Sequence, residues 1–194
     1  MLIDNVRDID ELDAVLELVF STFPQLKNGE YRYSRSFWIE KMNELPELLL
    51  YARDGDTVCG FVYAWIDNGS VTIAHCGVAR AYRGMGIGKT LMLEVEKRAK
   101  SLGYQSIALG SVEGAEGFYE KLGYKGSLLI QSEQHSIDEL QSLNTSYEVI
   151  YTNVYDGTVN QVCLRLPIVD RELQLKYKES FPRCSTQMVF GKRL

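Results

Sequence analysis

The segment Gly84–Thr90, with the sequence GMGIGKT, is the feature that most constrains how this chain can fold. Alternating glycines let backbone N–H groups come close to an anion, because no side chain stands in the way. Apolar residues then recur at helical spacing, at Leu91, Met92, Val95, Ala99 and Leu102. The sequence therefore predicts a strand, a tight glycine loop and a helix start that together hold a phosphate-bearing group.

Two familiar phosphate-binding loops do not fit these residues. A nucleoside-triphosphate loop needs a glycine five residues before Gly88, where the chain has Arg83. The dinucleotide fingerprint starting at Gly84 needs its third glycine at the position of Lys89. The remaining interpretation is a loop that holds the pyrophosphate of an acyl carrier, with Arg83 and Lys89 as cations beside it.

The residues around the loop predict a domain that mixes helices and strands. Asp8 begins a first helix, with Glu11 at the spacing of a capping box, and Pro46 ends a second helix over residues 34–45. The turn sequences RDGD and DNG join three strand patterns into an antiparallel meander. The strand patterns cover residues 47–55, 57–69 and 70–79 before the loop, and after its helix come a strand at 106–112 and a short helix at 114–124.

The last third of the chain continues beyond this pattern. Its elements follow the order strand, helix, strand, strand, helix, strand, which is that of a ferredoxin-like unit. We expect an α+β core domain over residues 1–126 and a C-terminal α/β extension over residues 127–194. The final strand, at residues 186–194, would close the sheet of the core, which makes the rest of the extension an insertion.

Composition excludes several classes of protein. The formal net charge of −5 argues against broad nucleic-acid binding, which needs a dense basic surface. No apolar run approaches the roughly 18 residues of a membrane span, and the acidic N-terminus does not resemble a signal peptide. The four cysteines have neither zinc-ligand nor disulfide spacing, so we expect no metal and reduced thiols in the cytoplasm.

Two motifs in order resemble those of the GNAT superfamily of N-acetyltransferases. Arg83, Gly86 and Gly88 match its signature loop, and GFYEKLGYK at Gly117–Lys125 matches its second motif. The predicted element order over residues 2–124 is also similar to that of the family. The resemblance implies a mixed central sheet flanked by helices. It also implies acetyl transfer from acetyl-CoA to a primary amine, by direct attack in a ternary complex.

The resemblance also implies roles for individual residues. The backbone of Cys76 and Val78 would bind the pantetheine arm, and the Val78 N–H would stabilise the oxyanion. The loop residues Arg83, Gly84, Met85, Gly86, Ile87, Gly88, Lys89 and Thr90 would bind the pyrophosphate. Tyr119, in the second motif, would donate a proton to the leaving thiolate, since a phenol is protonated at neutral pH.

The general base is less clearly marked. His75 is the ionisable side chain on the strand before the loop, and it could take a proton from an ammonium near neutral pH. Simple alternation places His75 on the face opposite Thr72, Ala74 and Cys76, unless a bulge shifts the register. A packed core histidine, or water relays to Glu113 or Asp67, are the alternatives.

The acceptor would be an amine of a small molecule or a protein, with no nucleic acid or membrane involved. An aromatic set could wall its pocket, or part of that set could be core; its members are Phe23, Tyr31, Trp38, Tyr63 and Trp65. A different class of function is also compatible with the sequence, namely a noncatalytic acyl-CoA-binding or sensory module that uses the C-terminal unit for partner binding. Open sheet edges favour a homodimer.

Overall fold

The computed structural model describes residues 1–28, 33–67 and 69–194. It divides into two compact units, which we describe separately. The first unit contains Met1–Ile107 together with Arg193–Leu194, and the second contains Ala108–Lys192. This division follows contacts within the chain. The domain boundary at residue 126 that the sequence suggests stays a prediction.

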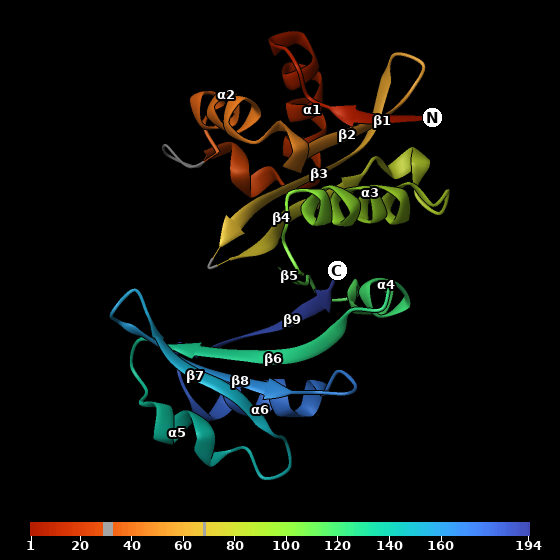
Figure 1. The fold of residues 1–194 in the computed structure, drawn as a ribbon. Coiled ribbons are helices and arrows are strands. Elements are labelled where there is room, and N and C mark those ends of the chain that lie inside the picture. Colours follow the sequence, from red (N-terminus) through yellow and green to blue (C-terminus); the bar gives the residue numbers. More distant parts are fainter. Residues whose placement is uncertain (29–32, 68) are drawn as a thin grey trace. The chain divides into compact units, whose positions relative to one another are not determined.

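The first unit is an antiparallel sheet between helices (Figure 1). Its four strands follow the order β1-β2-β3-β4. A side-chain cap begins each of the first two helices, since Asp8 accepts from the Glu11 N–H and Ser34 from the Phe37 N–H. The strands are β1 (Leu2–Asn5), β2 (Leu49–Asp54), β3 (Thr57–Asp67) and β4 (Ser70–Val78), and the helices are α1 (Ile9–Thr22), α2 (Arg35–Glu44) and α3 (Ile87–Ser101), with short 3₁₀ turns η1 (Pro24–Asn28), η2 (Pro46–Leu48) and η3 (Arg80–Tyr82).

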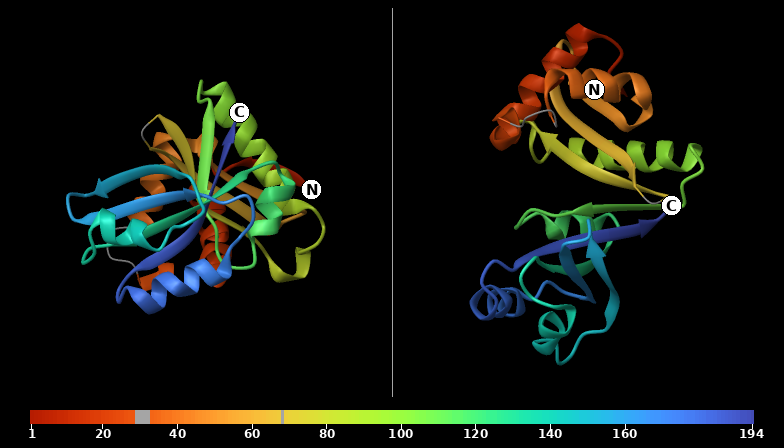
Figure 2. Two further views of the ribbon diagram at one scale, coloured as in Figure 1. Left: turned by 90° about the horizontal axis from the view of Figure 1, so that it is seen from below. Right: turned by 90° about the vertical axis from the view of Figure 1, so that its left-hand side faces the viewer.

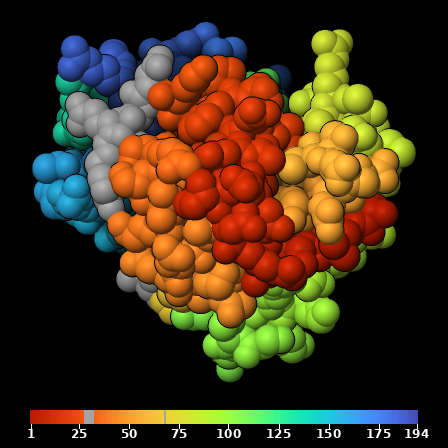
Figure 3. Space-filling view, turned by 90° about the horizontal axis from the view of Figure 1, so that it is seen from above, coloured from red at the N-terminus to blue at the C-terminus, as the bar shows by residue number. Residues whose placement is uncertain are grey.

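The two faces of this sheet are covered by different helices, as Figures 1 and 2 show. Helices α1 and α2 bury Trp38, Phe61 and Tyr63 in one core, and they form much of the face seen in Figure 3. Helix α3 covers the other face and approaches β3 closely at Gly60. A Cβ on Gly60 would lie 2.9 Å from side-chain atoms of both Ile87 and Leu91, so only glycine allows this contact.

A β-bulge interrupts β4 at Ala74. Tyr63 of β3 pairs with His75, but the next residue, Ala64, pairs with Ile73, so Ala74 is an extra residue. The bulge reverses the alternation that the sequence suggests. His75 shares a face with Tyr63 and with Thr72, on the side of α1 and α2, whereas Cys76 lies on the α3 side.

The second unit has the predicted order of elements. These are β6 (Lys125–Ser132), α5 (Ile137–Ser142), β7 (Val149–Tyr155), β8 (Val159–Arg165), α6 (Arg171–Ser180) and β9 (Ser185–Arg193), preceded by the end of β5 (Ser106–Gly110) and by α4 (Glu116–Lys121). The strand order is β5-β9-β6-β8-β7, and β6, β8, β7 and β9 pair antiparallel. Because β8 lies between β6 and β7, this is the split βαβ arrangement of a ferredoxin-like unit. The final strand lies between β5 and β6.

One face of this second sheet holds the core of the unit. Leu128, Ile130, Val162 and Leu164 are fully buried there. Tyr177 of α6 is also fully buried, and its hydroxyl donates to the Leu140 carbonyl of α5 at 2.7 Å. That bond ties the two helices together. The structure is thus α+β, with helices on its sheets and extra C-terminal strands, as the sequence predicts.

Candidate functional site

The glycine loop of the first unit adopts a conformation that needs glycine. After η3 the chain passes through Gly84, with φ 81°, and Gly86, with φ 83°. L-residues reach these angles only at a cost, because Cβ approaches the following carbonyl. A Cβ on either residue would otherwise meet open space, with nothing within 4 Å. The backbone path, rather than crowding, is what requires glycine here.

The start of α3 is open. No side chain caps Gly86, and the first turn of α3 contains no acidic residue. The other described helices of ten or more residues, α1, α2 and α6, all begin with a side-chain cap. The first N–H groups of a helix have no partner within the helix, and its dipole is positive at that end. This helix start therefore offers N–H donors to an anion.

Cations lie close to the open helix start in the sequence. Arg80, Arg83 and Lys89 flank Gly86 within six residues, and all three are exposed. The Arg83 Nε–H donates to the Val78 carbonyl at 3.3 Å, which ties the loop to the last residue of β4. The Thr90 N–H and hydroxyl both donate to the Gly86 carbonyl, at 3.0 and 3.1 Å, and they close the first turn. The arrangement is suited to a group with several negative charges.

The end of β4 presents backbone groups away from β3. The Ala79 N–H donates to the Cys59 carbonyl at 2.9 Å, so residue 79 is directed toward β3. Alternation then directs the N–H and C=O groups of Cys76 and Val78 away from β3. An extended polar chain can pair with such groups as an added strand would. Burial raises the pKa of the Cys76 thiol to about 12, so it stays protonated and is not a nucleophile at neutral pH.

His75 is half-buried among aromatic rings. Its ring centroid lies 5.1 Å from that of Phe23 and 5.2 Å from that of Tyr33. Tyr33 has φ 75°, an uncommon backbone conformation for a residue other than glycine. The bulge at Ala74 is what directs His75 to this cluster. Sequence reasoning missed Tyr33, and no local pattern marks it.

The aromatic set that could wall an acceptor pocket divides into two groups. Trp38 and Tyr63 are 0% and 3% exposed, and their rings contact each other, so they are core. Phe23 and Trp65 are only partly buried against that core, so part of each side chain stays exposed. Tyr31 lies outside the described residues.

In the second unit, Tyr119 and Tyr124 have different surroundings. The half-buried Tyr119 is on α4, where its ring centroid lies 5.7 Å from that of Phe190 and 6.1 Å from that of Tyr124. Tyr124 is only 4% exposed, and the Lys192 Nζ lies 5.3 Å from its ring centroid. Tyr124 therefore packs within the unit, while Tyr119 keeps part of its side chain accessible.

Two further observations concern the described residues only. No group of three or more His, Cys, Asp or Glu side chains there could hold a metal ion. Within the same residues, the helices are too short or too polar to span a membrane.

The chain belongs to the acetyltransferase (GNAT) family, whose family model matches residues 12–124. An acetyltransferase of Yersinia pestis (strain Pestoides F) is 32% identical over 88 residues, which are 44% of this chain and 62% of that relative. The match thus spans less than two thirds of the length of that curated relative.

Solved structures share the fold. Naa50 of Arabidopsis thaliana, in complex with the bisubstrate analogue CoA-Ac-MVNAL, matches with a TM-score of 0.56 and 21% identity, covering 100% of this chain and 98% of that one. An aminoglycoside 6′-N-acetyltransferase complexed with coenzyme A matches with a TM-score of 0.55 and 19% identity, covering 88% and 99%. At these identities the likeness concerns the fold alone.

Proposed function

We propose that this protein is an N-acetyltransferase that transfers an acetyl group from acetyl-CoA to a primary amine. The observation that carries the proposal is the uncapped start of α3 beside the outward-directed backbone of Cys76 and Val78. One end of that arrangement suits a pyrophosphate and the other suits a chain of amides, and coenzyme A has these two parts. Both solved relatives described above have coenzyme A, alone or within an analogue, in their complexes.

The residues of the first unit fit the parts of the cofactor. The loop residues Arg83–Thr90 bind the pyrophosphate through N–H groups and the positive charges of Arg83 and Lys89. Cys76 and Val78 pair with the pantetheine amides. The Val78 N–H stabilises the negative charge that develops on the thioester oxygen, since a fixed donor there is most effective in the transition state.

Two side chains move protons in the proposed reaction. Bound acetyl-CoA supplies an activated acyl group, and the amine attacks it directly. His75 takes a proton from the acceptor ammonium, so that the nitrogen has a free electron pair. As the new N–C bond forms and the C–S bond breaks, the nitrogen releases its second proton to water and Tyr119 gives its phenolic proton to the sulfur, after which Tyr119 regains a proton from water. Each of the two rings is half-buried beside other aromatic rings of its own unit, and such an environment supports a role in proton transfer.

The kind of acceptor is inferred from the acetyl-transfer reaction and not from a defined pocket. The analogue bound to Naa50 carries a peptide, and the other relative is named for an aminoglycoside, so the fold serves amines of both kinds. For this chain we propose a primary amine of a small molecule or a protein. Phe23 and Trp65, the accessible members of the aromatic set, are proposed to contact it.

An amine panel tests the activity. The protein is incubated with acetyl-CoA and single amines, among them peptides, polyamines and amino sugars, and release of the CoA thiol is measured. Turnover on any of these amines above the hydrolysis rate supports the enzyme. Tight binding of acetyl-CoA without turnover on any amine would instead favour a noncatalytic acyl-CoA-binding or sensory module.

The proposal also covers the domain boundaries and the cellular location of the protein. We propose a core over residues 1–126, an extension over residues 127–194, and a cytoplasmic protein whose four cysteines are free thiols.

We also propose a homodimer formed through β7. This edge strand has no charged residue and exposes Tyr151, Val154 and Tyr155 by 44%, 48% and 59%, a pattern that favours pairing with another strand. A monomeric mass by light scattering would refute the dimer.

A further inference from the structure

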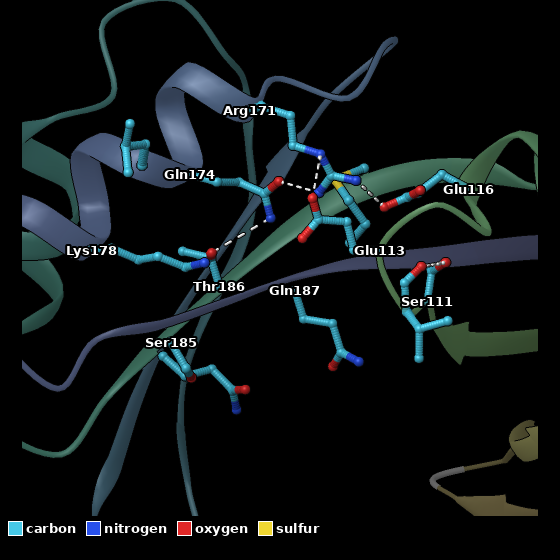
Figure 4. A pocket seen from close by; sticks show the side chains of 13 residues that line it. Ser111, Glu113, Glu116, Arg171, Gln174, Lys178, Ser185, Thr186 and Gln187 are labelled. Carbon is cyan, nitrogen blue, oxygen red and sulfur yellow. Dashed lines mark hydrogen bonds and ion pairs between the residues drawn. The ribbon is translucent and has the colours of Figure 1, made fainter. Parts of the chain in front are cut away.

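The second unit contains a polar pocket of about 700 Å³ that acetyl transfer does not use (Figure 4). Its walls come from α6, from the first half of β9 and from the segment between β5 and α4. The Ser111 N–H donates to the Met188 carbonyl at 2.8 Å, and beyond this bond β9 continues along the pocket. Six of the thirteen lining residues have amide or hydroxyl side chains, among them Gln131, Gln187 and Ser185.

A buried network fixes one cation of this pocket. The Glu116 side chain is 8% exposed; one of its oxygens accepts from the Gly114 N–H at 2.7 Å, and the other accepts from the Arg171 Nη2. Gln174, also 8% exposed, accepts from the Arg171 Nη1 at 2.6 Å. The guanidinium is held from two sides, but the Arg171 side chain as a whole is 43% exposed. Because a guanidinium has five N–H donors, several remain available to a ligand.

An acidic residue lies beside this cation and forms only a long ion pair with it. The Glu113 carboxylate is 80% exposed, and its Oε1 lies 4.0 Å from the Arg171 Nε, which is beyond hydrogen-bond distance. Figure 4 shows both groups at the same side of the pocket. Two exposed, opposite charges at this spacing match a ligand that carries a carboxylate next to an ammonium, with each charge facing its opposite.

A second cation lines the pocket further along α6. Arg171, Gln174 and Lys178 follow each other at helical spacing and lie on one face of α6. In Figure 4 the Lys178 side chain extends toward Thr186, and among the described residues Lys178 forms no ion pair. This end of the pocket therefore suits a second carboxylate.

We propose that this pocket binds a free α-amino acid with an acidic side chain. Arg171 binds the α-carboxylate, Glu113 the ammonium, and Lys178, together with the neighbouring hydroxyl and amide groups, the side-chain carboxylate. The site goes beyond the proposed acetyl transfer, because neither Tyr119 nor any residue of the glycine loop lines it. It gives the second unit the role of sensing a metabolite.

Calorimetric titration of the full chain with L-glutamate, without acetyl-CoA, tests this proposal. Glutarate lacks the ammonium, and L-glutamine lacks the second carboxylate. We expect each to bind about tenfold or more weakly than L-glutamate, as the loss of one charged hydrogen bond implies. Absence of binding by L-glutamate at millimolar concentration would overturn the proposal.

Substitutions of two exposed residues test which of them contacts the ammonium of the ligand and which contacts its side-chain carboxylate. Glu113→Gln should remove the preference for L-glutamate over glutarate, and Lys178→Gln should remove the preference for L-glutamate over L-glutamine. Glu179→Gln, on the same helix but outside the pocket, should keep both preferences. If either preference survives its own substitution, the assignment is wrong. Arg171 is not substituted in this test, because its loss would leave Glu116 buried without a countercharge.

Discussion

The starts of α3 and α6 have opposite construction. Helix α6 begins at Asp170, whose carboxylate accepts from the Leu173 N–H, and its first residue, Arg171, is held by Glu116. Helix α3 begins at a glycine with no side-chain cap and no acid in its first turn. Capping groups stabilise a helix but occupy its donors. The comparison indicates that the start of α3 leaves its N–H donors for an anionic ligand, while at the start of α6 the Asp170 carboxylate already occupies the Leu173 N–H.

The largest effect should separate catalysis from cofactor binding. Tyr119→Phe keeps the ring and its contacts but removes the proton donor, so turnover should fall by about 10²–10⁴. Affinity for acetyl-CoA should stay near that of the wild type, because we assign cofactor binding to the first unit. Steady-state rates and calorimetry measure the two quantities.

Tyr124→Phe is the matched control for this variant. Tyr124 is packed within the second unit, so its loss of a hydroxyl should leave turnover within a few-fold of the wild type. If Tyr119→Phe turns over like the wild type, a water molecule is the acid and our assignment is wrong.

The next effect concerns stability of the second unit. Arg171→Met should lower the free energy of unfolding by about 2–3 kcal/mol, because the Glu116 carboxylate then stays buried without a countercharge. Lys89→Met, at the open start of α3, should change it by no more than about 0.5 kcal/mol. Denaturant titrations compare the variants. Equal losses for both would mean that the two helix starts do not differ as described.

A third prediction concerns affinity at the open helix start. Arg83→Ala should weaken coenzyme A binding about ten- to a hundredfold, the usual value of a charged hydrogen bond. The difference from the wild type should shrink at high salt, because ions screen exposed charges. Arg165→Ala, which removes an exposed ion pair with Glu148, is the control and should leave affinity unchanged. Equal affinities for wild type and Arg83→Ala would exclude Arg83 from the site.

Substitution of two glycines by alanine should change stability by smaller amounts and in opposite directions. Gly86→Ala should cost about 1–2 kcal/mol of stability, because its φ is positive. Gly117→Ala, in α4 with open space around its Cβ, should instead stabilise by about 0.4–1 kcal/mol. Thermal unfolding measures both. A stabilised Gly86→Ala variant would show that the loop does not need its left-handed conformation.

The smallest expected effect concerns the stability of the protein at low pH. The Leu173 N–H and the Tyr147 hydroxyl hold the pKa of Asp170 below its usual value. For Glu116, burial raises the pKa, but the hydrogen bonds from backbone N–H groups and Arg171 outweigh this and lower it. A carboxyl group whose pKa is lower in the folded than in the unfolded state stabilises the protein at pH values above its unfolded-state pKa. This contribution is lost as pH falls below about 4. Asp170→Asn should therefore flatten the loss of stability between about pH 4 and 2, and an unchanged profile would contradict this.

Local chemistry made much of this structure predictable from sequence. The cap at Asp8 and the glycine loop each follow from residues close together in the chain. The bulge at Ala74 could not be predicted, because it depends on how β3 pairs with β4. The amino-acid pocket was missed for a similar reason, since Glu116 and Arg171 are 55 residues apart. The roles of His75 and Tyr119 stay predictions, because they concern protons rather than fold.

Amide NMR spectra recorded during titration with coenzyme A test the central claim most directly. The account predicts that the resonances of Gly84–Thr90 shift as the pyrophosphate binds, while those of Arg171–Gln174 at the start of α6 stay in place. Pantetheine, which has no pyrophosphate, should shift the loop much less. Shifts at Arg171–Gln174 without any in Gly84–Thr90 would show that coenzyme A does not bind at the open helix start, and would contradict the account.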